Sequence, residues 1–316
     1  MGENIAILGG GAFGTSMASL LVDNGCSVSL WCYEKEVCDS IKINQENKTY
    51  LPGIKLSAEI KTTNDIQEVV ERSKWIFLAM PVEFLRNVLE QIKPFVKKEQ
   101  ILVCLSKGIE QDSLLFPVGI VEDILGFDFS KALISGPNFA KEIVQKCETA
   151  TVVGAQEESV AQELIKLLSN SYFKPQFCDD LIGVQVGGAV KNVYALAAGM
   201  VSTSCNSSAL LITQGLLEMA KLSEFLGGKK ETVYGLSGLG DLILSTTGLL
   251  SKNLRAGKLL QEGKSLDDLK KEFKVLPEGI NTLKSVYQLI QKHKLDLPIC
   301  KATYETVFEG KAFKVF

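Results

Sequence analysis

The stretch IAILGGGAFG, residues 5–14, decides how the first half of this chain folds. Its four apolar residues predict a buried strand, and Gly9, Gly11 and Gly14 satisfy the pattern G-x-G-x-x-G. The first glycine permits a tight turn, the second lets the backbone approach a pyrophosphate, and the third lets a helix pack closely on the strand. Because a helical pattern follows at once, its unpaired N–H groups would face the phosphates. The stretch therefore predicts a dinucleotide site.

Short apolar runs alternate with helical patterns through the rest of the first half. We expect strands at 4–8, 27–32, 75–79, 101–104, 132–134 and 150–154. We expect helices at 12–23, 35–43, 82–92, 113–125, 138–145 and 157–169. This alternation is typical of an α/β fold with a doubly wound, Rossmann-like parallel sheet.

The second half shows mostly long helical periodicities. They lie at 187–202, 207–226, 252–262, 265–273, 279–293 and 300–309. We therefore expect a dinucleotide-binding domain over residues 1–184 and an all-α substrate-binding domain over residues 185–316. Enzymes of this organisation commonly bind substrate in the crevice between the two domains.

Composition excludes several classes of protein. The net charge of −3 argues against nucleic-acid binding, which needs clustered positive charge. The eight cysteines form no Cys-x-x-Cys pair, so neither a zinc site nor a disulfide framework is expected, and no metal is predicted. No apolar run reaches the ~18 residues of a membrane span, and residues 5–8 are too short for a signal peptide, so we expect a cytoplasmic protein.

Proton transfer must rely on a group other than histidine. The one histidine, His293, lies in a polar helix end, where a surface position is expected. Lys191 is the one charged residue between residues 183 and 217, in a helix that is apolar on nearly all faces. Burial lowers the pKa of a lysine toward neutrality, which suits general acid/base catalysis. The alternative is a lysine whose amine reaches solvent at the helix edge.

Three other segments offer polar groups for the same site. Lys107 follows the strand at 101–104, at the end of the sheet where such folds bind ligands, although a simple loop charge is the alternative. Asp241 ends the glycine-dense stretch 235–241 and could instead cap a helix. The polar residues 251–255 open another helix and suit either a phosphate or solvent.

The end of the second strand bears on the choice of cofactor. Glu34 and Lys35 follow Tyr33 there, and no arginine is present to accept a 2′-phosphate. An acid at this place favours NAD over NADP, and Tyr33 could lie against the adenine. The alternatives are a solvated charge and an ordinary aromatic at a strand end.

Six segments in order resemble NAD(P)-dependent glycerol-3-phosphate dehydrogenase of the soluble bacterial biosynthetic type. They are GGGAFG (9–14), SKGIE (106–110), SGPNFAKE (135–142), GAVKNV (188–193), GLGD (238–241) and SKN (251–253). The resemblance implies reversible NAD(P)H-dependent reduction of dihydroxyacetone phosphate to sn-glycerol 3-phosphate, which feeds glycerophospholipid synthesis. It also implies NAD(H) or NADP(H) as cofactor, a phosphorylated triose as substrate, and commonly a homodimer.

The resemblance also assigns roles to individual residues. Lys191 matches the proton donor and acceptor, which Asp241 would orient, and Lys107 matches a lysine near both nicotinamide and substrate. The substrate-binding positions are matched by Lys107, Asn192, Asp241, Ser251, Lys252 and Asn253. The cofactor contacts are matched by Gly9, Gly11, Ala12, Phe13, Gly14, Tyr33, Pro81, Phe84, Lys107, Ala140, Arg255 and Glu278.

The chain departs from the family pattern at one of these positions, Lys252, and at two other places. Lys252 stands where the family has arginine, which keeps the charge but loses a bidentate fork for phosphate. Gln214 also replaces an arginine, and residues 201–206 form a shorter stretch than the family's. Two alternatives therefore stay open: a reductase of the ketopantoate or β-hydroxyacid type, and a relative that binds the dinucleotide without turnover.

Overall fold

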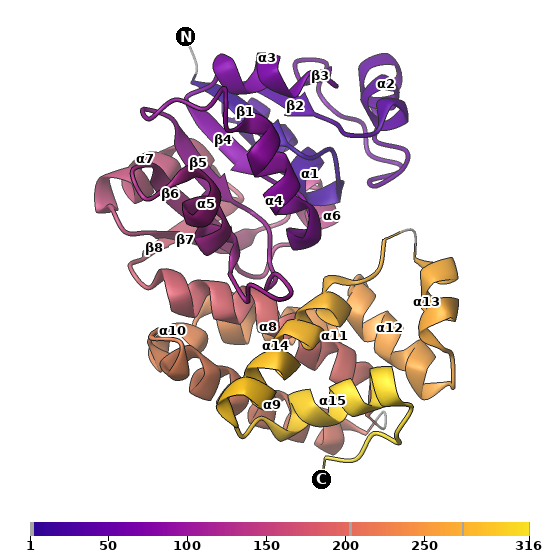
Figure 1. Cartoon of the computed structure of the whole chain (residues 1–316). Helices are drawn as coiled ribbons and strands as arrows, with labels where there is room; N and C mark the ends of the chain where they lie inside the picture. The colour runs from indigo at the N-terminus through magenta and orange to yellow at the C-terminus, as the bar shows by residue number, and fades with distance from the viewer. Residues whose placement is uncertain (1–2, 202–203, 274, 316) are drawn as a thin grey trace. The chain divides into compact units, whose positions relative to one another are not determined.

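The computed structural model describes residues 3–201, 204–273 and 275–315. The chain divides into two compact units (Figure 1). Unit 1 comprises the residues up to Ser106 and Pro117–Asp179, and unit 2 comprises Lys107–Phe116 and the residues from Asp180 on. The expected boundary between residues 184 and 185 therefore differs from this division in two places. Residues 107–116 belong to unit 2 because Ile109 is buried in its core and accepts a hydrogen bond of 2.9 Å from Ser285.

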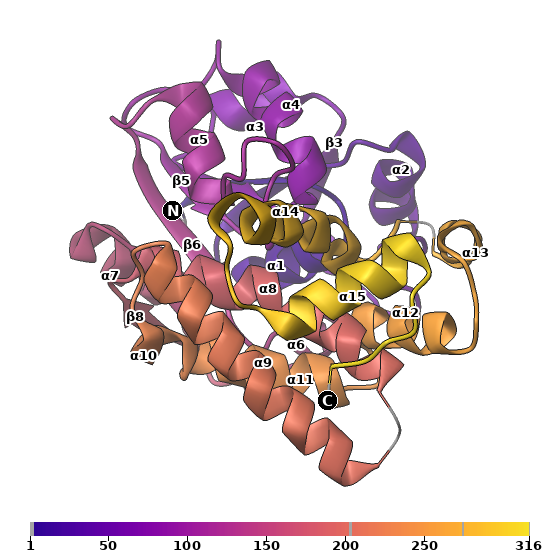
Figure 2. The same cartoon turned by 60° about the horizontal axis from the view of Figure 1, so that its bottom comes forward.

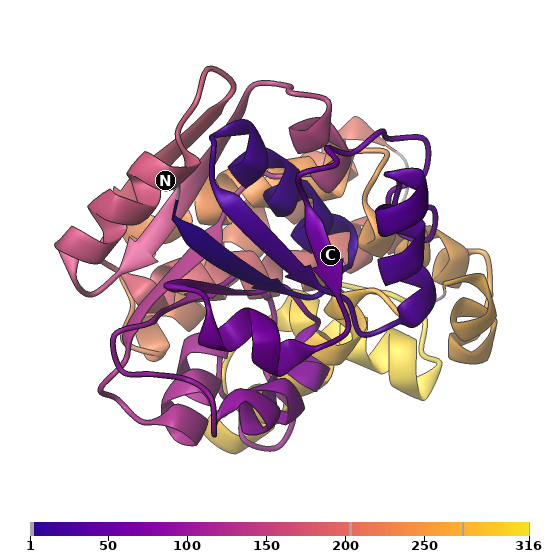
Figure 3. The same cartoon turned by 90° about the horizontal axis from the view of Figure 1, so that it is seen from above.

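Unit 1 is built on one eight-stranded sheet with the order β3-β2-β1-β4-β5-β6-β7-β8. The strands are β1 (Asn4–Leu8), β2 (Ser27–Trp31), β3 (Lys61–Thr63), β4 (Trp75–Leu78), β5 (Ile101–Cys104), β6 (Ser130–Ser135), β7 (Thr149–Ala155) and β8 (Phe173–Cys178). Strands β1 and β2, drawn in indigo, lie side by side in Figure 3. The predicted α/β, doubly wound fold is confirmed, but β6 and β7 pair antiparallel, so the sheet is not wholly parallel as expected.

Helices cover both faces of this sheet. They are α1 (Ala12–Asp23), α2 (Lys35–Asn44), α3 (Ile66–Glu71), α4 (Val82–Ile92), α5 (Pro117–Leu125), α6 (Ala140–Val144) and α7 (Glu158–Leu168). Helix α1 packs on α6 and on α7, while α4 packs on α3 and on α5. Ile5, Ala6, Ile7 and Leu8 are all inaccessible to solvent, as a strand covered on both faces requires.

Unit 2 is helical in the residues that the structure describes. Its elements are α8 (Leu181–Met200), α9 (Cys205–Phe225), α10 (Lys230–Val233), the π-helical turn η1 (Leu236–Gly240), α11 (Asp241–Thr247), α12 (Lys252–Gln261), α13 (Leu266–Glu272), α14 (Glu278–His293) and α15 (Pro298–Glu309). Helix α9 runs as one long helix with α15 beside it (Figure 2). Helix α8 begins earlier than the expected residue 187, because the side chain of Asp180 caps it by accepting the N–H of Gly183 at 2.9 Å.

Helix α8 is the centre of unit 2 and packs on α9, α11, α12 and α14. Within the described residues it is the one single helix long and apolar enough to cross a membrane, but 83% of that window is buried inside the protein. The pair Lys230–Thr247 and Lys252–Gln261 passes the same test only together, with a bend of 50°. Such burial is the property of a core helix.

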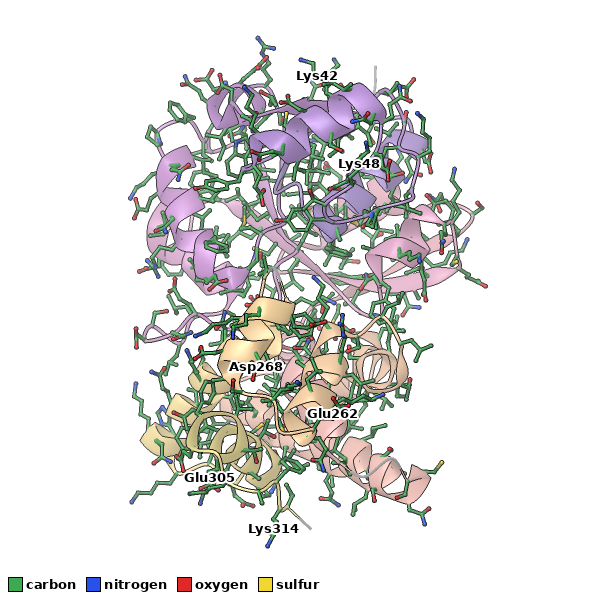
Figure 4. The ribbon with its side chains drawn as sticks, turned by 90° about the vertical axis from the view of Figure 1, so that its right-hand side faces the viewer. Lys42, Lys48, Glu262, Asp268, Glu305 and Lys314 are labelled. Carbon is green, nitrogen blue, oxygen red and sulfur yellow. The ribbon has the colours of Figure 1, made fainter. Side chains whose placement is uncertain are left out.

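Most charged side chains lie on the outside of each unit. Lys42 and Lys48 of unit 1 and Glu262 of unit 2 are exposed (Figure 4). His293 is exposed at the end of α14, as its polar neighbours predict. All eight cysteines are free thiols.

Candidate functional site

The glycine turn, residues 9–14, joins β1 to α1 through backbone that only glycine tolerates at two positions. Gly9 has a φ of +124°, in the region that side chains rarely adopt. A Cβ atom on Gly14 would lie 2.0 Å from the carbonyl oxygen of Gly9. The third glycine of the motif therefore has the packing role that the pattern predicts.

Gly11 differs from Gly14 because a Cβ atom built on it would meet nothing within 4 Å. Gly11 is the N-cap of α1, so the open space lies where the helix presents its N–H groups. An anion binds favourably at such a place, and a side chain would occupy it. These residues fit the diphosphate of a dinucleotide cofactor.

The glycine turn lies at the point where the strand order reverses. β1 has β2 on one side and β4 on the other, and ligands bind at this place in open α/β sheets. Tyr33 follows β2 and is 80% exposed, while Phe84 near the start of α4 is 48% exposed. Tyr33 lies edge-on to the ring of Trp31, with ring centroids 6.3 Å apart, and most of its surface is open to a bound molecule.

The other predicted cofactor residues of unit 1 have partly structural positions. Pro81 is the N-cap of α4, and Ala140 is the first residue of α6. Phe13 packs against the hydrophobic core, and Ala12 begins α1. Phe13 therefore contributes to the packing of unit 1.

Two lysines and one carboxylate meet inside unit 2. Nζ of Lys191 lies 2.7 Å from Oδ1 of Asp241, and Nζ of Lys107 lies 2.6 Å from Oδ2 of the same residue. Their side chains are 10%, 2% and 18% exposed for Lys191, Asp241 and Lys107. We call these three residues the lysine–aspartate cluster.

Close packing of backbone brings the members of the cluster together. A Cβ atom on Gly187 of α8 would lie 2.6 Å from the carbonyl oxygen of Ser237, so glycine permits η1 to approach α8. Asp241 follows as the first residue of α11. Asp241 does not cap α11, because the N-cap residue is Gly240. Its carboxylate forms two ion pairs instead.

Burial and charge shift the proton affinities of the cluster in opposite directions. Burial lowers the pKa of Lys191 to about 8, although Asp241 opposes that shift. Burial alone would raise the pKa of Asp241, but Lys107 and Lys191 lower it further than burial raises it. The cluster therefore holds a carboxylate that stays ionised and an amine that can exchange a proton near neutral pH.

Ser245 is a member of this site that the sequence did not reveal. Its Oγ lies 2.7 Å from Nζ of Lys191, and the residue is 2% exposed. Ser245 lies one helical turn after Asp241 on α11, so the spacing i, i+4 places both on one face. That spacing was the signal available in the sequence. A serine in a helix is common, however, whereas a single charged residue in an apolar helix, such as Lys191, is rare.

Asn192 and Asn253 form a second polar group in unit 2. Nδ2 of Asn253 donates to Oδ1 of Asn192 at 2.9 Å, and Oδ1 of Asn253 accepts the N–H of Gly279 at 3.0 Å. Because Oδ1 of Asn192 accepts this hydrogen bond, the orientation of its amide is fixed, and Nδ2 of Asn192 is the atom that can donate to a ligand. Both residues are less than 10% exposed, at 7% and 9%.

The start of α12 is a capped and partly solvated helix end. Ser251 accepts the N–H of Leu254 at 3.2 Å as the N-cap, and Lys252 is exposed. Arg255 pairs with Glu272 and lies over the ring of Phe273. Arg255 is therefore engaged within unit 2.

The remaining predicted positions are placed as follows. Glu278 is the first residue of α14, and Gln214 lies exposed on α9. Of the shortened stretch 201–206, Ser202 and Thr203 lie outside the described residues. Over the ranges that the structure describes, no group of three or more His, Cys, Asp or Glu side chains is placed to hold a metal ion.

Comparisons with known proteins identify the family of this chain. The sequence model described as the NAD-dependent glycerol-3-phosphate dehydrogenase N-terminus matches residues 4–161, and its C-terminal counterpart matches residues 180–316. The glycerol-3-phosphate dehydrogenase [NAD(P)+] of Carboxydothermus hydrogenoformans is 38% identical over 97% of this chain and 92% of its own length. The enzyme of that name from Bacillus subtilis is 39% identical over 98% of this chain and 91% of its own.

A solved structure is similar over the whole fold. The crystal structure of glycerol-3-phosphate dehydrogenase from Coxiella burnetii has a TM-score of 0.94 and 32% sequence identity. The match covers 98% of this chain and 96% of that one.

Proposed function

Because the chain belongs to the NAD-dependent glycerol-3-phosphate dehydrogenase family, we propose that it reversibly reduces dihydroxyacetone phosphate to sn-glycerol 3-phosphate with NAD(P)H. The observation that carries this proposal is the buried amine of Lys191 held between Asp241 and Ser245. A ketone reduction needs a proton donor beside the carbonyl. The amine of Lys191 suits this role because it is buried, has a lowered pKa and is held by two hydrogen bonds.

Lys191 acts as the general acid in reduction and as the general base in oxidation. The bound cofactor supplies the hydride, and the protein supplies position and charge. The ammonium of Lys191 gives a proton to the oxygen that forms at C2 of the substrate. A pKa of about 8 makes both protonation states of Lys191 accessible near neutral pH.

Asp241 and Ser245 hold the amine in place, and Lys107 adds positive charge. Asp241 accepts from both lysines, and Ser245 lies 2.7 Å from the amine of Lys191, so two of its hydrogen-bonding directions are fixed. The third direction is left for the substrate oxygen. Lys107 stabilises the negative charge that develops on that oxygen.

The phosphate of the substrate binds at the start of α12. Ser251, Lys252 and Asn253 lie there, and the N-terminus of the helix favours an anion. Asn192, whose amide is oriented by Asn253, donates to a substrate oxygen. Lys252 binds phosphate as a point charge, without the two parallel hydrogen bonds of an arginine.

The cofactor binds at the glycine turn of unit 1. Its diphosphate occupies the space beside Gly11, and Tyr33, Pro81, Phe84 and Ala140 of the same unit contact the rest of it. The enzyme acts in the cytoplasm as a homodimer and supplies glycerophospholipid synthesis, without nucleic-acid partners.

The test is oxidation of NADH and of NADPH by the purified protein with dihydroxyacetone phosphate, ketopantoate and a β-keto acid as separate substrates. Of the three substrates, we expect only dihydroxyacetone phosphate to be reduced. Faster turnover of a substrate without phosphate would favour the ketopantoate or β-hydroxyacid type. Dinucleotide binding with no turnover of any of the three would favour the binding-only alternative.

A further inference from the structure

A fully buried amide, that of Asn47, ties the segment after α2 to the glycine turn. Nδ2 of Asn47 donates to the carbonyl oxygen of Gly10 and to Oγ1 of Thr15, both at 2.8 Å. Oδ1 of Asn47 accepts the backbone N–H of Tyr50 at 3.0 Å. A buried side chain with its donors and acceptor engaged in this way has one orientation. The backbone of Tyr50 is therefore fixed relative to the glycine turn.

The hydroxyl of Tyr50 donates in turn to Oε1 of Glu34. Glu34 follows β2 and is the N-cap residue of α2, and its side chain makes no capping hydrogen bond. Burial and the neighbouring Glu34 raise the pKa of Tyr50 to about 12, so the hydroxyl keeps its proton and donates at neutral pH. The carboxylate is thus held by a donor whose own position is set by the glycine turn.

We propose that Tyr50 is a positioning residue for cofactor choice: its hydroxyl holds the Glu34 carboxylate where it accepts the adenosine ribose hydroxyls of NAD(H) and repels the 2′-phosphate of NADP(H). This inference rests on the proposed dinucleotide-dependent function. A carboxylate offers about four lone-pair positions, so one bond from tyrosine leaves positions for the ribose. Without that bond, a glutamate side chain at a strand end would sample several rotamers.

Lys35 makes the choice between NAD(H) and NADP(H) depend on the position of the Glu34 carboxylate. It is exposed and adjacent in sequence, and an ammonium there would attract a 2′-phosphate. A fixed carboxylate counters that attraction, whereas a carboxylate free to turn away does so less. Selection of NAD(H) therefore depends on Tyr50 although its hydroxyl need not touch the cofactor.

The experiment measures the dissociation constants of NADH and NADPH by fluorescence titration of the full chain without substrate. For Tyr50→Phe we expect the NADH constant to rise about tenfold, as loss of one hydrogen bond to a charged group implies, while the NADPH constant does not rise. For Glu34→Gln, which keeps an acceptor but loses the charge, we expect binding to shift toward NADPH.

The matched control is Tyr172→Phe. The hydroxyl of Tyr172 donates to Asp23 at 3.1 Å, and its pKa is likewise raised to about 12 by burial and that carboxylate. We expect this variant to bind both dinucleotides as the unaltered chain does, with an unfolding temperature similar to that of Tyr50→Phe.

Two results would overturn the inference. Equal weakening of both dinucleotides in Tyr50→Phe would assign Tyr50 a structural role, and unchanged constants would assign it none. If only the proposed function is wrong, the binding results would still hold: the unaltered chain would bind NADH more tightly than NADPH, and Tyr50→Phe would lose this preference. The unaltered chain would, however, not reduce dihydroxyacetone phosphate. Absence of any dinucleotide binding by the unaltered chain would overturn both.

Discussion

The glycine turn of unit 1 offers backbone N–H groups from one short segment at the start of α1, whereas the lysine–aspartate cluster of unit 2 offers side chains from three separate segments. The turn works because side chains are missing from it, and the cluster works because three charged side chains are withdrawn from water. A methyl group is therefore the sharpest perturbation of the first, and removal of a charge is the sharpest perturbation of the second.

Replacing the amine of the cluster should have the largest effect. For Lys191→Ala we expect the kcat of dihydroxyacetone phosphate reduction to fall about 10²–10⁴-fold, the usual contribution of general acid catalysis. NADH binding should persist, because the glycine turn is untouched. The control is Lys221→Ala, which removes an exposed lysine of α9 paired with Asp296 at 3.1 Å. A loss of only a few fold in Lys191→Ala would contradict the assigned role.

Two alanine substitutions in the glycine turn should separate stability from binding. In Gly14→Ala the new Cβ atom would lie 2.0 Å from a carbonyl oxygen, so we expect the free energy of unfolding to fall by about 1–3 kcal/mol. In Gly11→Ala the Cβ atom meets open space, so we expect unchanged stability but weaker NADH binding. Thermal unfolding and NADH titration measure the two effects. Tight NADH binding by Gly11→Ala would mean that the diphosphate lies elsewhere.

The pH dependence of the two directions should be opposite. Reduction needs the protonated amine of Lys191, so its kcat should decline above a pH of about 8, while oxidation needs the neutral amine and should rise through the same range. The change approaches about tenfold for each pH unit. Asp241→Asn removes the carboxylate that raises the pKa of Lys191, so both profiles should move to lower pH. Profiles that stay in place would show that another group titrates.

Ser245 should contribute least. Ser245→Ala removes one neutral partner of the Lys191 amine, so we expect kcat to fall by about threefold to tenfold, the contribution of a single hydrogen bond. Ser245→Thr should recover activity, because it keeps the hydroxyl, provided that the added methyl group is accommodated. Thr247, an exposed residue of the same helix, gives the control Thr247→Ala. An unchanged kcat in Ser245→Ala would leave Asp241 as the one residue that orients the amine.

The contrast between the local glycine turn and the lysine–aspartate cluster also explains which features could be predicted from the sequence. The glycine turn was predictable because its geometry is local, and Lys191 was predictable because a lone charge in an apolar helix is rare. β3 and β8 were missed because the first is short and polar and the second carries Pro175, which is confined to edges or bulges of sheets. Helix α11 was missed because the glycines of 235–240 indicate a loop, while packing against α8 makes the segment helical.

The antiparallel pairing of β6 and β7 was also beyond local patterns. Both strands are mostly buried, and their direction depends on the path of the chain through α6 rather than on composition. Likewise, nothing in Lys107 itself indicates that it shares a carboxylate with Lys191, since that contact depends on long-range packing.

The excursion of residues 107–116 into unit 2 has a consequence for dissecting the gene. A polypeptide that starts at Asp180 would include Lys191 and Asp241 but neither Lys107 nor the buried Ile109. It would leave one oxygen of Asp241 without its cation and an apolar gap in the core. Complementation between separately expressed halves would therefore require the first half to donate a short loop, much as a split protein is restored by a peptide from its missing piece.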